Sequence, residues 1–245
     1  MSKHVSFKII FIPGGPGLSS HYLIPLKDAI SQKYNASILK MERLSDSAFK
    51  NIHPFFSEIE RTLDRKYRYI LIGHSYGCEV ALSLLARRKL DIAGLILVNW
   101  IPAGHSNRFN TQLKRIIPPD TRFPLRNERD FRNYFRSILP LYFYRTANAK
   151  KYENLVTSHS YSLKSKKIMQ PPFMRGHKIK QQDLSLLYTI ESEHDMLLSK
   201  SDSRWMKKLF FKRHATIKNA GHFSMLEQKH ALVQQLLKNI ADIMK

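Results

Sequence analysis

The sequence predicts an α/β protein: a mostly parallel sheet of about six strands, covered by helices on both faces. Two observations carry this prediction. Short, continuous apolar runs recur along the chain, and such runs are typical of strands that are buried on both faces of a parallel sheet. Between them lie amphipathic stretches with the apolar spacing of helices that pack on a sheet.

The expected elements alternate in chain order. Strands are expected at 7–12, 36–41, 68–72, 94–98, 186–190 and 215–217, and helices at 20–33, 51–65, 78–88 and 225–244. In the second of these helices Phe55, Ile59 and Leu63 are four positions apart, which puts them on one face. The first apolar run leads into Pro-Gly-Gly-Pro-Gly at 13–17 and not into a small-residue cleavage site, so we interpret it as a strand and not as a secretory signal.

Composition is that of a soluble globular protein. The chain has 245 residues, of which 43% are hydrophobic, and its mean hydropathy is −0.36. This length suits one large domain with a modest insertion, and no apolar run is long enough to span a membrane. Cys78 is the single cysteine, which excludes an internal disulfide and indicates a reducing, cytoplasmic compartment. We expect Cys78 to be a small packing residue.

The segment 103–182 interrupts the strand–helix rhythm. It is rich in proline, arginine and aromatic residues, and it lies between two expected strands, so we predict a helical cap inserted into a core formed by 1–102 and 183–245. The whole chain carries 41 Lys+Arg against 19 Asp+Glu, a net charge of +22. The predicted cap holds 17 Lys+Arg and 4 Asp+Glu, so +13 of that charge lies in it (17 − 4).

Ser75 lies at the centre of a Gly-His-Ser-Tyr-Gly pentapeptide, residues 73–77, between an expected strand and an expected helix. In this context G-x-S-x-G predicts a sharp turn that projects the serine oxygen above the sheet as a nucleophile. The flanking glycines let strand and helix approach each other, and the helix amino terminus points toward developing negative charge.

A serine nucleophile needs a base and a carboxylate that orients the base. Asp195 follows the strand expected at 186–190, and His222 lies between the last expected strand and the terminal helix. Both therefore fall at the carboxyl ends of strands, where open α/β sheets bind ligands. Glu193 is a rival for the role of Asp195. We expect His74 to pack or to form hydrogen bonds rather than to act as the base, and His194 to be exposed.

The loop 13–17 follows the first strand and is expected to complete an oxyanion hole. Pro16 has no amide hydrogen, so the expected donors are the backbone N–H groups of Gly15 and Tyr76. The Lys-Ser/Thr sequel of a phosphate-binding loop is missing. No pair of histidines has metal-ligand spacing, so neither a metal nor another cofactor is expected.

Together these motifs resemble the α/β-hydrolase superfamily. They are Gly-Gly-Pro-Gly at 14–17, Gly-His-Ser-Tyr-Gly at 73–77, Asp195, Ala-Gly-His-Phe at 220–223, and Glu227. The resemblance implies an α/β-hydrolase fold without the usual amino-terminal hairpin, and a catalytic triad of Ser75, Asp195 and His222. The glycine loop is similar to the proline iminopeptidase branch, although Pro13 stands where that branch usually has histidine.

Charge bears on the substrate. An iminopeptidase must hold a free α-ammonium group, which a basic cap disfavours, so that activity is the alternative to an esterase or thioesterase. The basic cap favours a substrate with a negative handle: a small carboxylated ester, or an acyl thioester carried by coenzyme A or by an acidic acyl carrier protein. The candidate substrate-binding residues are Trp100, Arg122, Arg126, Arg129 and Arg132. The arginines recur at a spacing that would align them on one helical face, although a solvated face would look the same.

A second class of function stays open. The net charge could instead make the chain a non-catalytic basic binding protein on the same fold, with an affinity for anionic partners that depends on salt. The sequence contains no motif that reads DNA or RNA, so no specific nucleic acid partner is expected.

Overall fold

The computed structural model describes residues 6–15, 20–45, 47–48, 52–102, 127–157, 180–210 and 213–245. Its centre is a six-stranded sheet in which every pairing is parallel, in the order β2-β1-β3-β4-β5-β6. The strands are β1 (Ser6–Ile12), β2 (Ala36–Ile38), β3 (Tyr67–His74), β4 (Ile92–Val98), β5 (Leu187–Ser192) and β6 (His214–Ile217). The predicted parallel α/β architecture is therefore confirmed.

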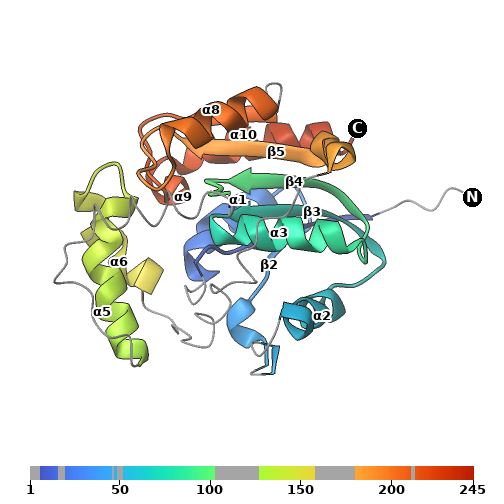
Figure 1. Cartoon of the computed structure of the whole chain (residues 1–245), viewed down its shortest axis with the longest axis horizontal. Helices are drawn as coiled ribbons and strands as arrows, with labels where there is room; N and C mark the ends of the chain where they lie inside the picture. The colour runs from blue at the N-terminus through green and yellow to red at the C-terminus, as the bar shows by residue number, and fades with distance from the viewer. Residues whose placement is uncertain are drawn as a thin grey trace, which may run out of the picture.

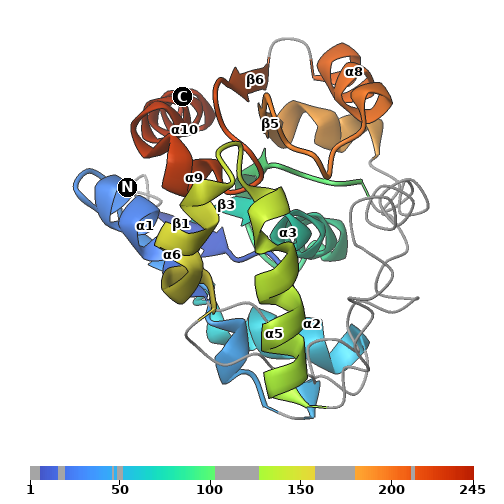
Figure 2. The same ribbon diagram turned by 90° about the vertical axis from the view of Figure 1, so that its left-hand side faces the viewer.

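Helices cover both faces of the sheet (Figure 1). The helices within the strand framework are α1 (Ile24–Ser31), α2 (Ile52–Thr62), α3 (Tyr76–Arg87), α8 (Lys200–Leu209), α9 (Ser224–Glu227) and α10 (Lys229–Ile243). Helices α1 and α10 lie on one side of the strands, and α3 and α8 lie on the other (Figure 2). This arrangement buries apolar residues on both faces, as the continuous apolar strands predict.

Alternate residues of each strand divide between two cores. On β1, Ile9 and Phe11 join the core that contains α1 and α10, whereas Ile10 and Ile12 join the core that contains α2 and α3. All four side chains are at most 2% exposed. At about 1.5–3 kcal/mol for each large apolar side chain that is fully buried, these cores are the main source of stability.

The described part of the chain between β4 and β5 forms α5 (Glu128–Ile138), the 3-10 helix η6 (Leu139–Tyr142) and α6 (Ala147–Thr157), followed by the 3-10 helix η8 (Gln181–Leu186). Asn127 caps α5 by accepting a hydrogen bond from the Asp130 backbone N–H. Helices α5 and α6 lie beyond the carboxyl end of β4, beside the ends of the strands that carry the candidate site residues (Figure 1). That the whole of 103–182 forms a cap stays a prediction.

Several element boundaries differ from the prediction. The strand expected at 36–41 ends at Ile38, and a 3-10 helix η2 (Met41–Arg43) follows. The helix expected from residue 20 begins as a 3-10 turn, η1 (Ser20–Leu23), and becomes α-helical at Ile24, where Pro25 occupies an early position that needs no amide hydrogen. The terminal helix is interrupted at Gln228, which has a non-helical backbone (φ −132°, ψ 47°).

Helix α8 was not predicted. Ser199 caps it by accepting a hydrogen bond from the Asp202 backbone N–H. Met206 on its inner face belongs to the core that contains α2 and α3. Seven of its ten residues are Lys, Arg, Ser or Asp, so its apolar periodicity is weak. Its stability comes from the cap and from packing.

Candidate active site

Ser75 occupies a sharp turn between β3 and α3. Its backbone has φ 53° and ψ −122°, a conformation that residues other than glycine rarely adopt. Such a conformation costs about 1–3 kcal/mol. Two backbone hydrogen bonds hold this turn: Ser75 N–H donates to Val98 O (3.0 Å) and Cys78 N–H donates to Ser75 O (3.0 Å). Strain held in place at a strand–helix junction is the geometry of a nucleophile elbow.

Gly77 is required by the close approach of α3 to β1. A Cβ at this position would overlap the carbonyl oxygen of Ile12 and lie 2.6 Å from that of Pro13. The second glycine of the pentapeptide thus lets the helix that follows Ser75 start directly behind the loop that follows β1.

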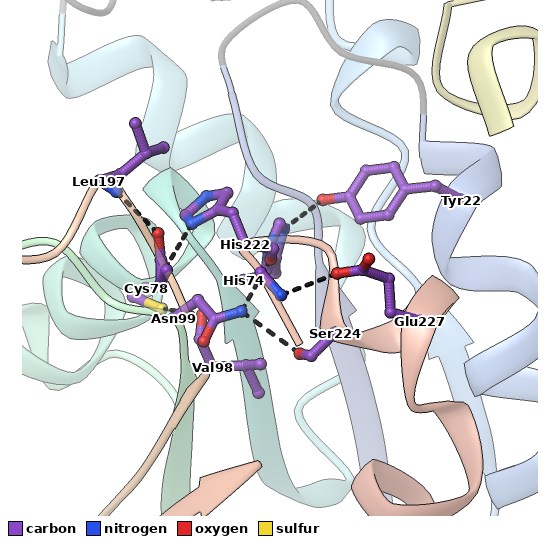
Figure 3. Close-up of polar contacts among 11 residues, drawn as sticks. Tyr22, His74, Cys78, Val98, Asn99, Leu197, His222, Ser224 and Glu227 are labelled. Atoms are coloured by element: carbon purple, nitrogen blue, oxygen red, sulfur yellow. Dashed lines mark hydrogen bonds and ion pairs between the residues drawn. The ribbon is translucent and has the colours of Figure 1, made fainter. Parts of the chain in front are cut away.

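His222 and Asp195 form a buried pair. Asp195 Oδ2 lies 2.7 Å from His222 Nδ1, and the side chains are 1% and 2% exposed respectively. The Leu197 backbone N–H donates to the other oxygen, Asp195 Oδ1 (3.0 Å), which fixes the carboxylate plane (Figure 3). Because a carboxylate accepts, Nδ1 of His222 carries the hydrogen, and Nε2 is left as the basic nitrogen.

The rival carboxylate points elsewhere. Glu193 is exposed, accepts a hydrogen bond from the Asn219 backbone N–H (3.1 Å) and lies 3.4 Å from the ring of His194, which is exposed as expected. Among the described residues, then, Asp195 and not Glu193 is paired with His222.

His74, which precedes Ser75 in the chain, links the turn at Ser75 to this pair. The rings of His74 and His222 have centroids 4.9 Å apart, and His74 is 3% exposed. Within the described residues, Ser75 is held through its backbone, and its hydroxyl makes no hydrogen bond to His222. Such catalytic hydrogen bonds are often long until a substrate is bound.

The backbone of His222 is fixed from two sides. Its carbonyl oxygen accepts from Asn99 Nδ2 (2.7 Å) and from His74 Nε2 (2.9 Å). Asn99 directly follows β4, has a left-handed backbone (φ 50°) that asparagine tolerates, and also donates to Ser224 Oγ (3.3 Å) (Figure 3). The prediction that His74 forms hydrogen bonds agrees with this geometry, whereas Asn99 was not singled out from the sequence.

Glu227 ties the loop of His222 to the chain between η6 and α6. One carboxylate oxygen accepts from the backbone N–H groups of Gly221 (2.7 Å) and Tyr144 (3.0 Å). The other accepts from Arg145 N–H (3.1 Å) and Asn148 Nδ2 (2.9 Å). Four donors around one carboxylate make a strong clamp, because hydrogen bonds to a charged group contribute about 1.5–3 kcal/mol each.

Aromatic rings close the space around His222. Tyr142 lies edge-on to it (centroids 5.5 Å apart), and the carbonyl oxygen of Tyr142 accepts from Phe223 N–H (3.3 Å). Burial, and then the charges of Tyr134 and Asp195, raise the pKa of the Tyr142 phenol, so it stays protonated. The environment of the imidazole is therefore apolar and poor in water, which strengthens electrostatic interactions there.

The expected oxyanion donors belong to the turn at Ser75 and to the loop that follows β1. Tyr76 is the first residue of α3, so its backbone N–H lies at the positive end of that helix. Gly15 follows β1 and has a left-handed backbone (φ 54°). Burial, and then the charge of Glu79, raise the pKa of the Tyr76 phenol, so this phenol stays protonated.

The structure describes three of the five expected substrate-binding residues. Trp100 is 4% exposed and belongs to the core that contains α2 and α3, where its indole N–H donates to the Glu79 carboxylate (2.8 Å). On α5, Arg129 is exposed and Arg132 is partly buried. Arg122 and Arg126 lie outside the described residues. A substrate role for any of these residues stays a prediction.

Cys78 behaves as a packing residue. It is buried, and its thiol donates to the carbonyl oxygens of Gly73 (3.2 Å) and Val98 (3.5 Å). Burial, and then Glu79, hold the pKa of this thiol well above its usual value, which leaves it in the unreactive thiol form.

The described residues contain neither a metal-binding cluster nor a membrane-spanning helix. No group of three or more His, Cys, Asp or Glu side chains among them is arranged to hold a metal ion. None of the helices in the described ranges combines the length and apolar character of a membrane span.

Comparison with known proteins agrees with this architecture. A family model described as the alpha/beta hydrolase family matches residues 9–235. No curated protein matches the sequence.

Solved structures of similar fold include two esterases and an epoxide hydrolase. A thermophilic esterase from Thermogutta terrifontis is 12% identical, with a TM-score of 0.65 and coverage of 98% of this chain and 92% of that one. A putative aryl esterase from Burkholderia cenocepacia is 18% identical, with a TM-score of 0.62 and the same coverage. An epoxide hydrolase from Bacillus megaterium is 12% identical, with a TM-score of 0.65 and coverage of 98% and 95%. At these identities the likeness establishes the fold, and the reaction must be argued from the site.

Proposed function

Because this chain belongs to the alpha/beta hydrolase family, we propose that it is a serine hydrolase that cleaves a carboxylic ester or thioester through an acyl-enzyme. The roles are Ser75 as nucleophile, His222 as base and Asp195 as the carboxylate that orients the base. The observation that carries the proposal is the buried hydrogen bond of 2.7 Å between His222 and Asp195, next to a serine held in a strained turn.

Acylation follows from these roles. Nε2 of His222 takes the hydroxyl proton as Ser75 Oγ attacks the substrate carbonyl carbon, and the carbonyl oxygen becomes an oxyanion. The backbone N–H groups of Tyr76 and Gly15 donate to this oxyanion; losing one such donor typically costs about 3–4 kcal/mol. The tetrahedral intermediate collapses, the bond to the alcohol or thiol breaks, and Nε2 returns the proton to the leaving group.

Deacylation repeats the sequence with water. Nε2 of His222 takes a proton from water, the hydroxide oxygen attacks the acyl carbon, and Ser75 Oγ leaves with the proton that Nε2 returns. Asp195 stays ionised and stabilises the imidazolium form of His222 at each proton transfer. The net reaction consumes one water and releases a carboxylic acid.

The test uses a fluorophosphonate probe and p-nitrophenyl esters. We expect the probe to label Ser75, and Ser75→Ala to abolish both labelling and ester turnover while the protein stays folded. Ser83→Ala is the matched control, because Ser83 is a buried serine on α3, the helix that follows Ser75, and its hydroxyl donates to the Glu79 carbonyl (2.7 Å). Turnover by Ser75→Ala equal to that of the wild type would refute the proposal. A wild type that neither reacts with the probe nor turns over esters would favour a non-catalytic basic binding protein.

The positive charge extends the proposal to a substrate with a negative handle. In the described part of 103–182, Arg129, Lys150 and Lys151 are exposed, whereas Arg136 is engaged with Glu153 (2.8 Å). A panel that compares neutral esters with carboxylated esters, coenzyme A thioesters and acyl carrier thioesters tests this. A clear preference for neutral esters would refute the proposal of a substrate with a negatively charged group and leave the proposal of the triad intact.

A further inference from the structure

A chain of hydrogen bonds runs behind the nucleophile elbow, from the loop after β1 to the loop of His222. Gly14 N–H donates to Tyr22 Oη (2.5 Å), Tyr22 Oη lies 2.8 Å from His74 Nδ1, and His74 Nε2 lies 2.9 Å from the carbonyl oxygen of His222. Figure 3 shows Tyr22 reaching the ring of His74. Tyr22 is fully buried and His74 nearly so, which keeps water from substituting for either group.

In this series of hydrogen bonds, the donor and the acceptor of each bond can be assigned. A carbonyl oxygen only accepts, so His74 Nε2 carries the hydrogen and His74 Nδ1, in the neutral ring, accepts from the Tyr22 hydroxyl. The oxygen of that hydroxyl in turn accepts the Gly14 N–H. Burial, and then the charge of His222, hold the pKa of His74 well below its usual value, so the neutral ring is the stable form. Aligned hydrogen bonds of this kind polarise and strengthen one another.

Both ends of the chain belong to the proposed machinery. Gly14 is adjacent to Gly15, and a Cβ on Gly14 would lie 2.8 Å from the Cβ of Ser75 and from Nδ1 of His74. The loop therefore rests directly against the elbow. The N–H of Gly14 already donates to Tyr22, so it is not available to an oxyanion, and the neighbouring Gly15 stays the expected donor of this loop.

We propose that Tyr22 and His74 are positioning residues, which hold the oxyanion loop and the backbone of His222 at fixed places relative to Ser75. The inference rests on the proposed function, since it assigns these residues a part in the same reaction. Neither side chain exchanges a proton with the substrate: they set the geometry of the groups that do. Misplacement of such groups by about 1 Å can slow a reaction by about 100-fold.

Tyr22→Phe removes one oxygen and keeps the ring, which packs edge-on against Phe223 with centroids 5.4 Å apart. We expect kcat to fall by about 10- to 100-fold with KM within about twofold, because the lost interaction acts on groups that stabilise the transition state. Tyr69→Phe is the matched control. It removes a hydroxyl that donates to the Asp64 carbonyl (2.7 Å) at the opposite end of β3, from a side chain as buried as that of Tyr22, and we expect unchanged kcat.

Two substitutions at His74 separate the two ends of the chain. In His74→Gln the amide N–H can lie near the position of Nε2 and keep the bond to His222. In His74→Asn the amide oxygen can lie near the position of Nδ1 and keep the bond to Tyr22. We expect each to retain more activity than His74→Ala. We expect the double variant Tyr22→Phe/His74→Ala to be less than about threefold less active than His74→Ala alone. The series of hydrogen bonds is already interrupted in His74→Ala, so the loss of the Tyr22 hydroxyl should have little further effect.

The rate of Ser75 labelling by the fluorophosphonate distinguishes the possible failures. If the wild type is not labelled at Ser75, the proposed function fails and the inference fails with it. If the wild type is labelled, but Tyr22→Phe and Tyr69→Phe react and turn over as fast as the wild type, the positioning role alone is refuted. Equal losses of kcat in both tyrosine variants would also refute it, because the effect would then be general destabilisation.

Discussion

At the scale of single residues, the protonation of His222 decides whether the proposed chemistry works. Asp195 accepts from Nδ1 and so leaves Nε2 basic. In Asp195→Asn the amide can donate to Nδ1, which favours the tautomer with its hydrogen on Nε2. We expect kcat for ester hydrolysis to fall by about 10⁴-fold, the typical cost of a triad imidazole in the wrong tautomer, with little change in thermal stability.

Glu193→Gln is the control for this prediction, since Glu193 is a neighbouring carboxylate that does not contact His222. We expect it to retain activity within a few-fold. A larger loss of activity in Glu193→Gln than in Asp195→Asn would reverse the assignment of the orienting carboxylate.

The residues that could be predicted are those whose role follows from their place along a strand. Ser75, Asp195 and His222 each follow an apolar strand, and parallel strands bring their carboxyl ends to one edge. Tyr22 and Asn99 could not be predicted in the same way. Their roles depend on side-chain hydrogen bonds between layers of the fold, for which local sequence carries no signal, although a polar residue directly after a buried strand was a hint for Asn99.

At the scale of elements, Glu227 joins α9 to the start of α6. Glu227→Gln would turn an –NH2 group toward two of the four donors that now meet the carboxylate. We expect a loss of about 2 kcal/mol in the free energy of unfolding, a fall of about 4–8 °C in Tm and a lower kcat, because Gly221 precedes His222.

Glu153→Gln is the matched control for the clamp. Its ion pair with Arg136 is partly exposed and contributes at most about 1 kcal/mol. A Tm and a kcat of Glu227→Gln that match those of Glu153→Gln would contradict the clamp.

Among elements, the strands and sheet class were predictable because continuous apolar runs have few alternatives. The ends of the strands and helices were harder to predict. The strand β2 ends at Ile38 at the edge of the sheet, where it pairs with β1 alone, and so its apolar run continues into a loop. The break between α9 and α10 at Gln228 coincides with Glu227, whose carboxylate binds outside its own helix. Tertiary contacts override the helical pattern there.

At the scale of the whole molecule, the net charge of +22 makes acid a particular stress. As the 19 Asp and Glu side chains become protonated, repulsion among the basic residues grows and favours expansion. The carboxylates that resist protonation in the folded state are therefore the ones that set the acid limit of stability.

Glu191 on β5 is such a carboxylate. Burial alone would raise its pKa, but His214, whose Nε2 lies 3.5 Å from the carboxylate, together with Lys207 and Ser203, outweighs burial and lowers the pKa from 4.5 to about 2. A pKa that is depressed by folding contributes stability that is complete above about pH 4.5 and is lost as the pH falls toward 2. At about 1.4 kcal/mol per pH unit, this contribution is on the order of 3 kcal/mol.

Glu191→Gln should therefore lower the free energy of unfolding by about 2–3 kcal/mol at pH 6 and by much less near pH 2. The two stability curves should converge through this window, because only the wild type loses an ionised Glu191 there. Urea unfolding of both proteins between pH 2 and 7 measures the difference, and Glu153→Gln, at a partly exposed position, should run parallel to the wild type throughout. A constant gap between the wild type and Glu191→Gln across the whole range would mean that the glutamate acts by its packing and not by its charge.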